Sequence, residues 1–175
     1  MGLGGLSAVK IAAASDGRDG GLPLFFAYRD VVTKFSPVGQ NGSLVTFAGA
    51  DLGTVEGVLS GTIIQSFTIT VDVTTGAAST GPDDAVFTDL DRDQITFQYS
   101  GTGNFLPPNG LMSAGGSISV TYTVVDASGK YKFLIGRQFP AQVVATNAVN
   151  GSGGTLGCVY GEVYASDAKS IQKEL

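Results

Sequence analysis

The stretch Ser117-Ile-Ser-Val-Thr-Tyr-Thr-Val124 decides the fold class of this chain. Its apolar residues alternate with Ser and Thr, so counting by twos places every large apolar side chain on one face. Residues 67–73 and 94–99 alternate in the same way. This period of two is typical of half-buried β-strands, because successive strand side chains point to opposite faces.

Strand-like segments follow one another along most of the chain. Three Asn-Gly pairs, at Asn41, Asn109 and Asn150, indicate hairpin turns, because both residues tolerate the positive φ of a tight turn. Only residues 167–175 have a helical pattern. The alternating residues 67–73 belong to an expected strand at 64–73, and the further segments that we expect to be strands are 24–32, 43–48, 54–59, 86–87, 131–135, 141–148 and 155–164.

This pattern predicts an all-β fold of eight to ten sequential antiparallel strands, because parallel strands would need crossover helices. Such a meander closes into a barrel or splits into a sandwich. We expect a single up-and-down barrel of about eight strands with a short C-terminal helix. The predicted organisation is a flexible N-terminal arm (1–20), a barrel domain (21–166) and a C-terminal tail (167–175).

The composition excludes several classes of function. The chain has no histidine and a single cysteine, which removes His-based catalysis, an intrachain disulfide and a Cys-based zinc site. Ten Lys and Arg residues in a chain of net charge −5 give no basic footprint for nucleic acid. Asp89, Asp91 and Asp93 are spaced like the start of a calcium loop, but Gln94 and Ser100 break that motif. We therefore expect a hairpin turn there, no metal and no cofactor.

The N-terminal segment lacks the pattern of a signal peptide, because it has no early basic region and Lys10 interrupts its apolar run. The sequence contains no run of about 18 apolar residues, so it predicts no membrane-spanning helix. The sequence as written favours a cytoplasmic protein, or a secreted one if a signal peptide has been removed.

Residues 52–164 resemble the barrel family of allene oxide cyclase-like proteins, whose fold is close to that of dirigent proteins. The resemblance follows four segments, of which the last ends in the turn Asp126-Ala-Ser-Gly-Lys-Tyr131 and is followed by Gly136. Family members usually carry Gly-Gly-Thr-Gly-Lys/Arg-aromatic at that turn, so only Gly129, Lys130 and Tyr131 fit. The first three segments are 53–61, 67–76 and 93–103.

The resemblance implies a barrel of about eight antiparallel strands with an apolar lumen. Similar proteins include cofactor-free cyclases and stereoselectivity-directing proteins that hold a reactive polyene or oxylipin in a shaped cavity. It also implies a homo-oligomer, because related barrels pair or form trimers.

The last strand-like segment carries the candidate catalytic residues. Counting by twos puts Cys158, Tyr160, Glu162 and Tyr164 on one of its faces. If that face lines the lumen, burial raises the pKa of Glu162 and makes it a useful acid or base, with Tyr160 beside it as a hydrogen-bond donor. If it faces solvent, these residues have no catalytic role. We take Glu162 and Tyr160 as the candidate catalytic residues.

Other polar and aromatic strand residues are candidates for binding a substrate. Glu56 lies among small residues and would face Glu162 across a barrel, or lie at the rim or outside. Arg29 and Asp30 interrupt an apolar strand as a pair, either at a barrel mouth or on an outer face. The full set of expected substrate-binding residues is Glu56, Phe97, Tyr99, Tyr122, Cys158 and Tyr164.

Two functions from different classes remain open. The first is a cofactor-independent barrel that binds a hydrophobic small molecule and cyclises or isomerises it by confinement. The alternative is a structural or adhesive extracellular β-protein without catalysis, for which the low charge and the Ser/Thr/Gly-rich strands are typical. A lumen packed solid favours the structural protein, whereas a cavity with converging polar groups favours the ligand-binding one.

Overall fold

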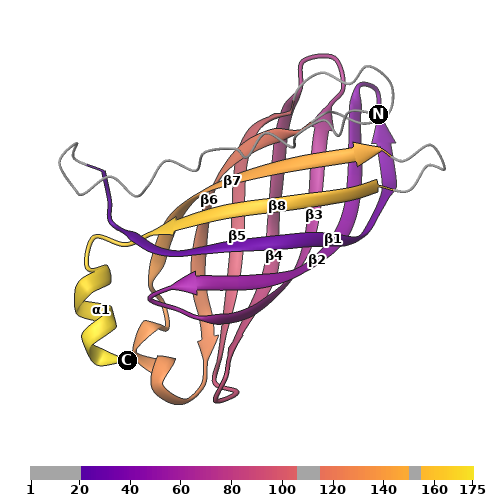
Figure 1. Ribbon diagram of the computed structural model, residues 1–175. Coiled ribbons are helices and arrows are strands. Elements are labelled where there is room, and N and C mark those ends of the chain that lie inside the picture. Colours follow the sequence, from indigo (N-terminus) through magenta and orange to yellow (C-terminus); the bar gives the residue numbers. More distant parts are fainter. Residues whose placement is uncertain (1–20, 106–114, 150–154) are drawn as a thin grey trace, which may run out of the picture.

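The computed structural model describes residues 21–105, 115–149 and 155–175, and these form one closed antiparallel barrel. Each of its eight strands pairs with the next, and β1 closes the barrel against β8 (Figure 1). The up-and-down barrel predicted from the sequence is confirmed, and the sandwich is excluded. The strands are β1 (Leu24–Asn41), β2 (Leu44–Gly57), β3 (Gly61–Asp72), β4 (Ala77–Asp89), β5 (Gln94–Phe105), β6 (Gly116–Ala127), β7 (Gln138–Val149) and β8 (Thr155–Tyr164).

The strands are longer than the sequence pattern predicts. Most of segments 43–48 and 54–59 belongs to one strand, β2, and β1 continues well past Val32 to Asn41. The Asn41-Gly42 turn joins β1 to β2 with Gly42 at φ 60°, as expected for a tight hairpin. The other two Asn-Gly pairs and the arm 1–20 lie outside the described residues.

The expected strand at residues 131–135 is wrong. Residues Gly129–Leu134 form a short 3-10 helix, η1, between β6 and β7. Tyr131 and Leu134 are buried and three residues apart, which suits the three-residue turn of that helix. Tyr131 donates a hydrogen bond to the Asp89 carboxylate (2.9 Å), and Lys130 forms an ion pair with the same carboxylate (2.9 Å). These two contacts hold η1 against the turn between β4 and β5.

That turn is the acidic segment for which we considered a calcium loop. The Asp89 carboxylate accepts hydrogen bonds from the backbone N–H groups of Asp91 (2.8 Å) and Asp93 (2.9 Å). Side chains that bond their own backbone in this way stabilise turns. The hairpin turn predicted here is confirmed.

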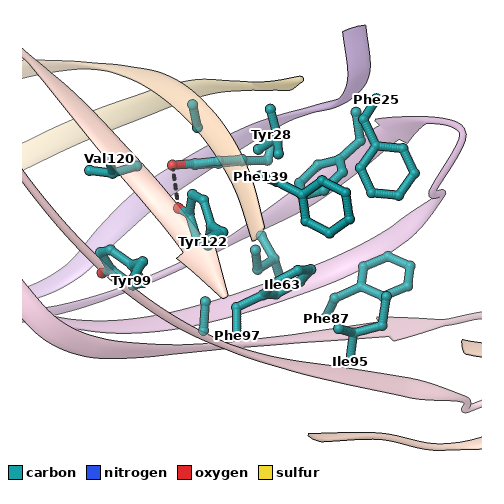
Figure 2. Close-up of a cluster of buried hydrophobic side chains, with 14 of the residues drawn as sticks. Phe25, Tyr28, Ile63, Phe87, Ile95, Phe97, Tyr99, Val120, Tyr122 and Phe139 are labelled. Atoms are coloured by element: carbon teal, nitrogen blue, oxygen red, sulfur yellow. Dashed lines mark hydrogen bonds between the residues drawn. The ribbon is translucent and has the colours of Figure 1, made fainter. Parts of the chain in front are cut away.

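One end of the barrel is filled by large apolar side chains. The rings of Phe25 and Phe139 lie 4.9 Å apart (Figure 2). Those of Phe26 and Phe97 lie 6.0 Å apart. The C-terminal helix α1 (Ala168–Glu174) lies beside this end and adds Ile171 to the core (Figure 1). The fully buried side chains at this end also include Leu59, Ile63, Phe87, Ile95 and Leu134.

Candidate functional site

The opposite half of the lumen contains a cavity of about 120 Å³. An engineered protein cavity of about 150 Å³ holds benzene, so this space suits a molecule with about one aromatic ring. In the part of the cavity far from the filled end, the walls are half-buried aromatic side chains. Near the middle of the barrel, the walls are polar side chains. The aromatic residues are Phe35, Phe47, Phe67 and Phe105, and the polar ones are Tyr28, Asp51, Gln65, Thr80, Tyr99 and Tyr122.

Two carboxyl groups are buried in the polar layer. Asp30 of β1 is 2% exposed and Asp51 of β2 is 3% exposed. Asp51 lies opposite Val32, two residues beyond Asp30, so the two side chains are diagonal neighbours on the inner face. Gly53 lies opposite Asp30, and a Cβ atom there would be 1.8 Å from Oδ1 of Asp30. The absence of a side chain at Gly53 therefore makes room for the Asp30 carboxyl.

A chain of hydrogen bonds leads across the lumen to Asp30. Gln65 donates from Nε2 to Oδ2 of Asp30 (2.5 Å) and accepts at Oε1 from the Tyr122 hydroxyl (2.9 Å). The Tyr122 oxygen is 2.8 Å from the Tyr28 hydroxyl, which is left to act as the donor (Figure 2). Every donor in this chain therefore points toward Asp30. This arrangement favours the ionised form of Asp30 over that of Asp51.

Burial raises the pKa of both carboxyls. Desolvation raises the pKa of Asp30 to about 6, opposed by the hydrogen bond from Gln65. Desolvation and the nearby charge of Asp30 raise the pKa of Asp51 to about 8. The negative charge of Asp30 also disfavours the ionisation of Asp51, so the two groups titrate as a pair. At neutral pH the pair thus holds one proton, mainly on Asp51, the member that lines the cavity.

The tyrosines around the pair are held neutral. Burial is the main cause that raises the pKa of Tyr28, Tyr99 and Tyr122 well above the usual value. The ring of Tyr99 lies 5.0 Å from that of Tyr122, and its hydroxyl donates to the backbone carbonyl of Ser66 (3.3 Å). These three residues therefore offer hydroxyl dipoles and ring faces to the cavity, without a charge.

Only part of the expected substrate-binding set lies in the lumen. Tyr99 and Tyr122 line the cavity, as the hypothesis requires. Phe97 also points inward, but it is fully buried in the filled end and packs its ring against that of Tyr122 at 5.5 Å. Phe97 therefore supports the base of the polar layer and does not line the cavity.

The candidate catalytic face of β8 lies outside the barrel, which is the second of the two placements that the sequence left open, and its place in the lumen is excluded. Val159 lines the cavity and Gly161 packs on Tyr28, which leaves the alternate residues of β8 on the outer face. There Tyr160 donates to Glu162 (2.8 Å), and Tyr164 also donates to it. Burial, followed by these bonds, raises the pKa of both tyrosines to about 12. The residues placed outside are Cys158, Tyr160, Glu162 and Tyr164.

Glu56 and Glu162 do not face each other across the lumen. Both lie opposite Ala27, one on each neighbouring strand, and both belong to the outer face. Glu56, Arg29 and Tyr160 border a small surface depression, with the Arg29 guanidinium 5.7 Å from the centre of the Tyr160 ring. The inward positions of β8 are occupied by Val and Gly. Burying these residues costs less desolvation free energy than burying a glutamate, and their small side chains leave space in the lumen.

The expected pairing of Arg29 with Asp30 is also wrong, because adjacent residues of a strand point to opposite faces. Tyr28 and Asp30 are buried inside, whereas Arg29 is exposed. Our sequence reasoning missed Asp51 and Gln65 altogether. The signal was present in the alternation, since Asp51 is in phase with Phe47 and Val55, and Gln65 with Ile63.

Compared with protein-family models, with curated proteins and with solved structures, the chain matches none of them. In the described part of the chain, no helix has the length and apolarity to cross a membrane. In the same residues, no three His, Cys, Asp or Glu side chains are grouped so as to hold a metal ion. The geometry of the lumen is therefore the basis for a functional proposal.

Proposed function

We propose that the protein binds a small hydrophobic molecule in its lumen and isomerises or cyclises it with the proton shared by Asp51 and Asp30. The observation that supports this most directly is a buried pair of carboxyls, one of which, Asp51, lies in the wall of a cavity lined mainly by apolar side chains. A lumen filled along its whole length would have favoured the structural alternative. The cavity and its polar layer favour ligand binding.

The chemistry balances without a cofactor. Asp51 gives its proton to one atom of the bound molecule, so an O–H bond breaks as a new bond to hydrogen forms. The pair then takes a proton back from another position of the molecule, and the product has the composition of the substrate. An acid with a pKa near the working pH is suited to both steps. The rings around the cavity hold the molecule in one shape, which lowers the entropic part of the barrier.

Binding is tested with toluene, followed by calorimetry and by ligand-detected NMR. Val143 and Val144 are adjacent on β7, but Val143 lines the cavity and Val144 is 46% exposed outside. We expect Val143→Phe to fill the cavity and weaken toluene binding at least tenfold, while Val144→Phe leaves it unchanged. If toluene fails to bind the wild-type protein, or binds both variants equally, the lumen is not a binding site.

Proton transfer is tested with cyclohexanone, a ring of the right size whose carbon-bound hydrogens exchange by acid–base catalysis. In D₂O, we expect the wild-type protein to accelerate exchange beside the carbonyl and Asp51→Asn to lose this effect by a factor of about 10²–10⁴, the usual range for a general acid or base. Equal exchange rates in the two proteins would contradict a role for the pair in proton transfer.

A further inference from the structure

Within the part of the chain that the structure describes, the buried carboxyl pair has no positively charged partner. The ion pairs of the described residues join Lys130 to Asp89 and Asp91, and Arg137 to Asp167; none reaches Asp30 or Asp51. The charged neighbours on β1, Arg29 and Lys34, are exposed. With one proton for two carboxyls, the pair keeps a net negative charge inside the barrel. A buried charge is normally paired, because desolvation without a partner is costly.

Hydrogen bonding at the pair is also incomplete. Oδ1 of Asp30 and Oδ1 of Asp51 are buried and have no hydrogen-bond partner among the described residues. Both side chains are more than nine-tenths buried, and Asp51 borders the cavity. A ligand that carries a positive charge and an N–H donor would satisfy both deficits at once.

The remaining walls of the cavity suit a cation as well as an apolar group. Ring faces attract cations through their quadrupole, more strongly where water is excluded. Three tyrosine hydroxyls lie in the same layer as Asp51. The aromatic residues that line the cavity are Tyr28, Phe35, Phe47, Phe67, Tyr99, Phe105 and Tyr122.

From these three observations we infer that the ligand is a small hydrophobic cation, an amine protonated at neutral pH and carried on an apolar group of about one ring. Its N–H groups donate to the unpartnered Oδ1 of Asp51, its positive charge lies beside the negative charge that the pair shares, and its apolar part lies among the phenylalanines. This inference rests on the proposed lumen binding and names the class of ligand for it. The net charge of −5 also favours the approach of cations over anions.

Three probes of one shape separate the possibilities: benzylamine, benzyl alcohol and toluene, each titrated by calorimetry at pH 7.5. We expect benzylamine to bind at least tenfold more tightly than benzyl alcohol. If all three fail to bind, the lumen-binding proposal itself is wrong. If benzyl alcohol and toluene bind as tightly as benzylamine, lumen binding stands and the cation inference is overturned.

A second measurement uses the wild-type protein at pH 5, where the carboxyl pair gains its second proton while benzylamine stays charged. Besides Asp30 and Asp51, the titratable groups in this layer are Tyr28 of β1, Tyr99 of β5 and Tyr122 of β6, which stay neutral across this range, and Asp83 of β4, which acts on Tyr99. We expect the advantage of benzylamine to fall at least fivefold. An unchanged advantage would overturn the inference.

Variants locate the effect. Asp30→Asn combined with Asp51→Asn removes the charge with nearly the same shape, and it should abolish the preference for benzylamine while toluene still binds. Glu162→Gln removes a carboxylate from the outer face and should leave the preference intact. If Glu162→Gln abolishes the preference and the double variant keeps it, the cation binds outside the lumen and the inference is wrong.

Discussion

Asp30 and Asp51 are buried side by side on adjacent strands, as diagonal neighbours across β1 and β2. Their environments differ, because Gln65 donates to Asp30 while Asp51 faces the cavity. Burial raises the pKa of both carboxyls, to about 8 for Asp51, where the charge of Asp30 adds to the effect, and to about 6 for Asp30, where the hydrogen bond from Gln65 opposes it. This difference separates an acid from a base at neutral pH, which is the basis of the predictions on pH and catalysis.

The stability of the protein should fall as the pH rises. Both carboxyls have a higher pKa in the folded state than in the unfolded chain, so the folded state binds more protons. The stabilisation is complete below about pH 4 and is lost as the pH rises through about 6 and 8. Thermal melts between pH 5.5 and 8.5 should show the decline, on top of any change from other groups.

Asp51→Asn isolates the contribution of the pair, because the amide cannot ionise. Each pKa unit corresponds to about 1.4 kcal/mol, or about 3–5 °C in Tm for a chain of this size. We expect the variant to melt at least that much higher than the wild type at pH 8.5. The control is Asp84→Asn, an exposed carboxyl on β4. A wild-type-like pH dependence in Asp51→Asn would show that the pair does not titrate as described.

Tyr122→Phe should destabilise the barrel although it removes a single oxygen atom. The change leaves Oε1 of Gln65 and the hydroxyl of Tyr28 without their partner in a buried site. Buried polar groups left unpaired cost about 1–3 kcal/mol each. Tyr160→Phe is the matched control, since its hydroxyl bonds Glu162 on the outer face, and it should cost less than about 1 kcal/mol in urea denaturation. Equal losses would argue against a stabilising hydrogen-bond chain.

Gly161→Ala should displace Tyr28 and so disturb the polar layer of the lumen. A Cβ atom at this position would lie 2.1 Å from Cζ of Tyr28, so the tyrosine ring must shift, which disturbs its hydrogen bond with Tyr122. Overpacking of this kind costs about 1–3 kcal/mol. Gly39→Ala meets nothing within 4 Å and should change stability by less than about 0.5 kcal/mol. Denaturant melts of the two variants measure the difference, and a neutral Gly161→Ala would mean that the close contact with Tyr28 is relieved without cost.

Glu162→Gln should leave the lumen chemistry unchanged. Glu162 lies on the outer face and accepts hydrogen bonds from Tyr160 and Tyr164. The backbone of β8 separates its carboxylate from the cavity. Toluene affinity and the rate of cyclohexanone exchange should therefore equal those of the wild type. A loss of exchange comparable to that of Asp51→Asn would restore Glu162 as the catalytic candidate.

The alternation of residues determines most of this fold. Residues 117–124 and 67–73 show which side chains share a face, and Asn41-Gly42 marks the hairpin that joins the first two strands. The 3-10 helix at 129–134 escaped prediction because Tyr131, Phe133 and Ile135 also alternate like a strand. Only the contacts of Tyr131 and Lys130 with Asp89, far away in the sequence, favour the helix.

The candidate site was harder to predict because a barrel strand can present either face to the lumen. In β8, Glu162 and the tyrosines looked like a functional face, but the inner positions are held by Val159, Gly161 and Val163. Gly161 is inside because Tyr28 from the neighbouring strand fills its space. That choice depends on side chains of another strand and has no signal within β8.

The sequence by itself determined the class of fold, the antiparallel order and the residues that share a face, since these follow from a period of two and from local turns. Only the tertiary structure decided which face is the lumen and which polar residues meet there. Asp30, Asp51, Gln65 and Tyr122 come from four strands, and they meet because closing the barrel sets the register between those strands. Register is a property of pairs of strands, so the carboxyl pair became visible only once β1 was paired with β2, and its link through Gln65 to Tyr122 only once the barrel was closed.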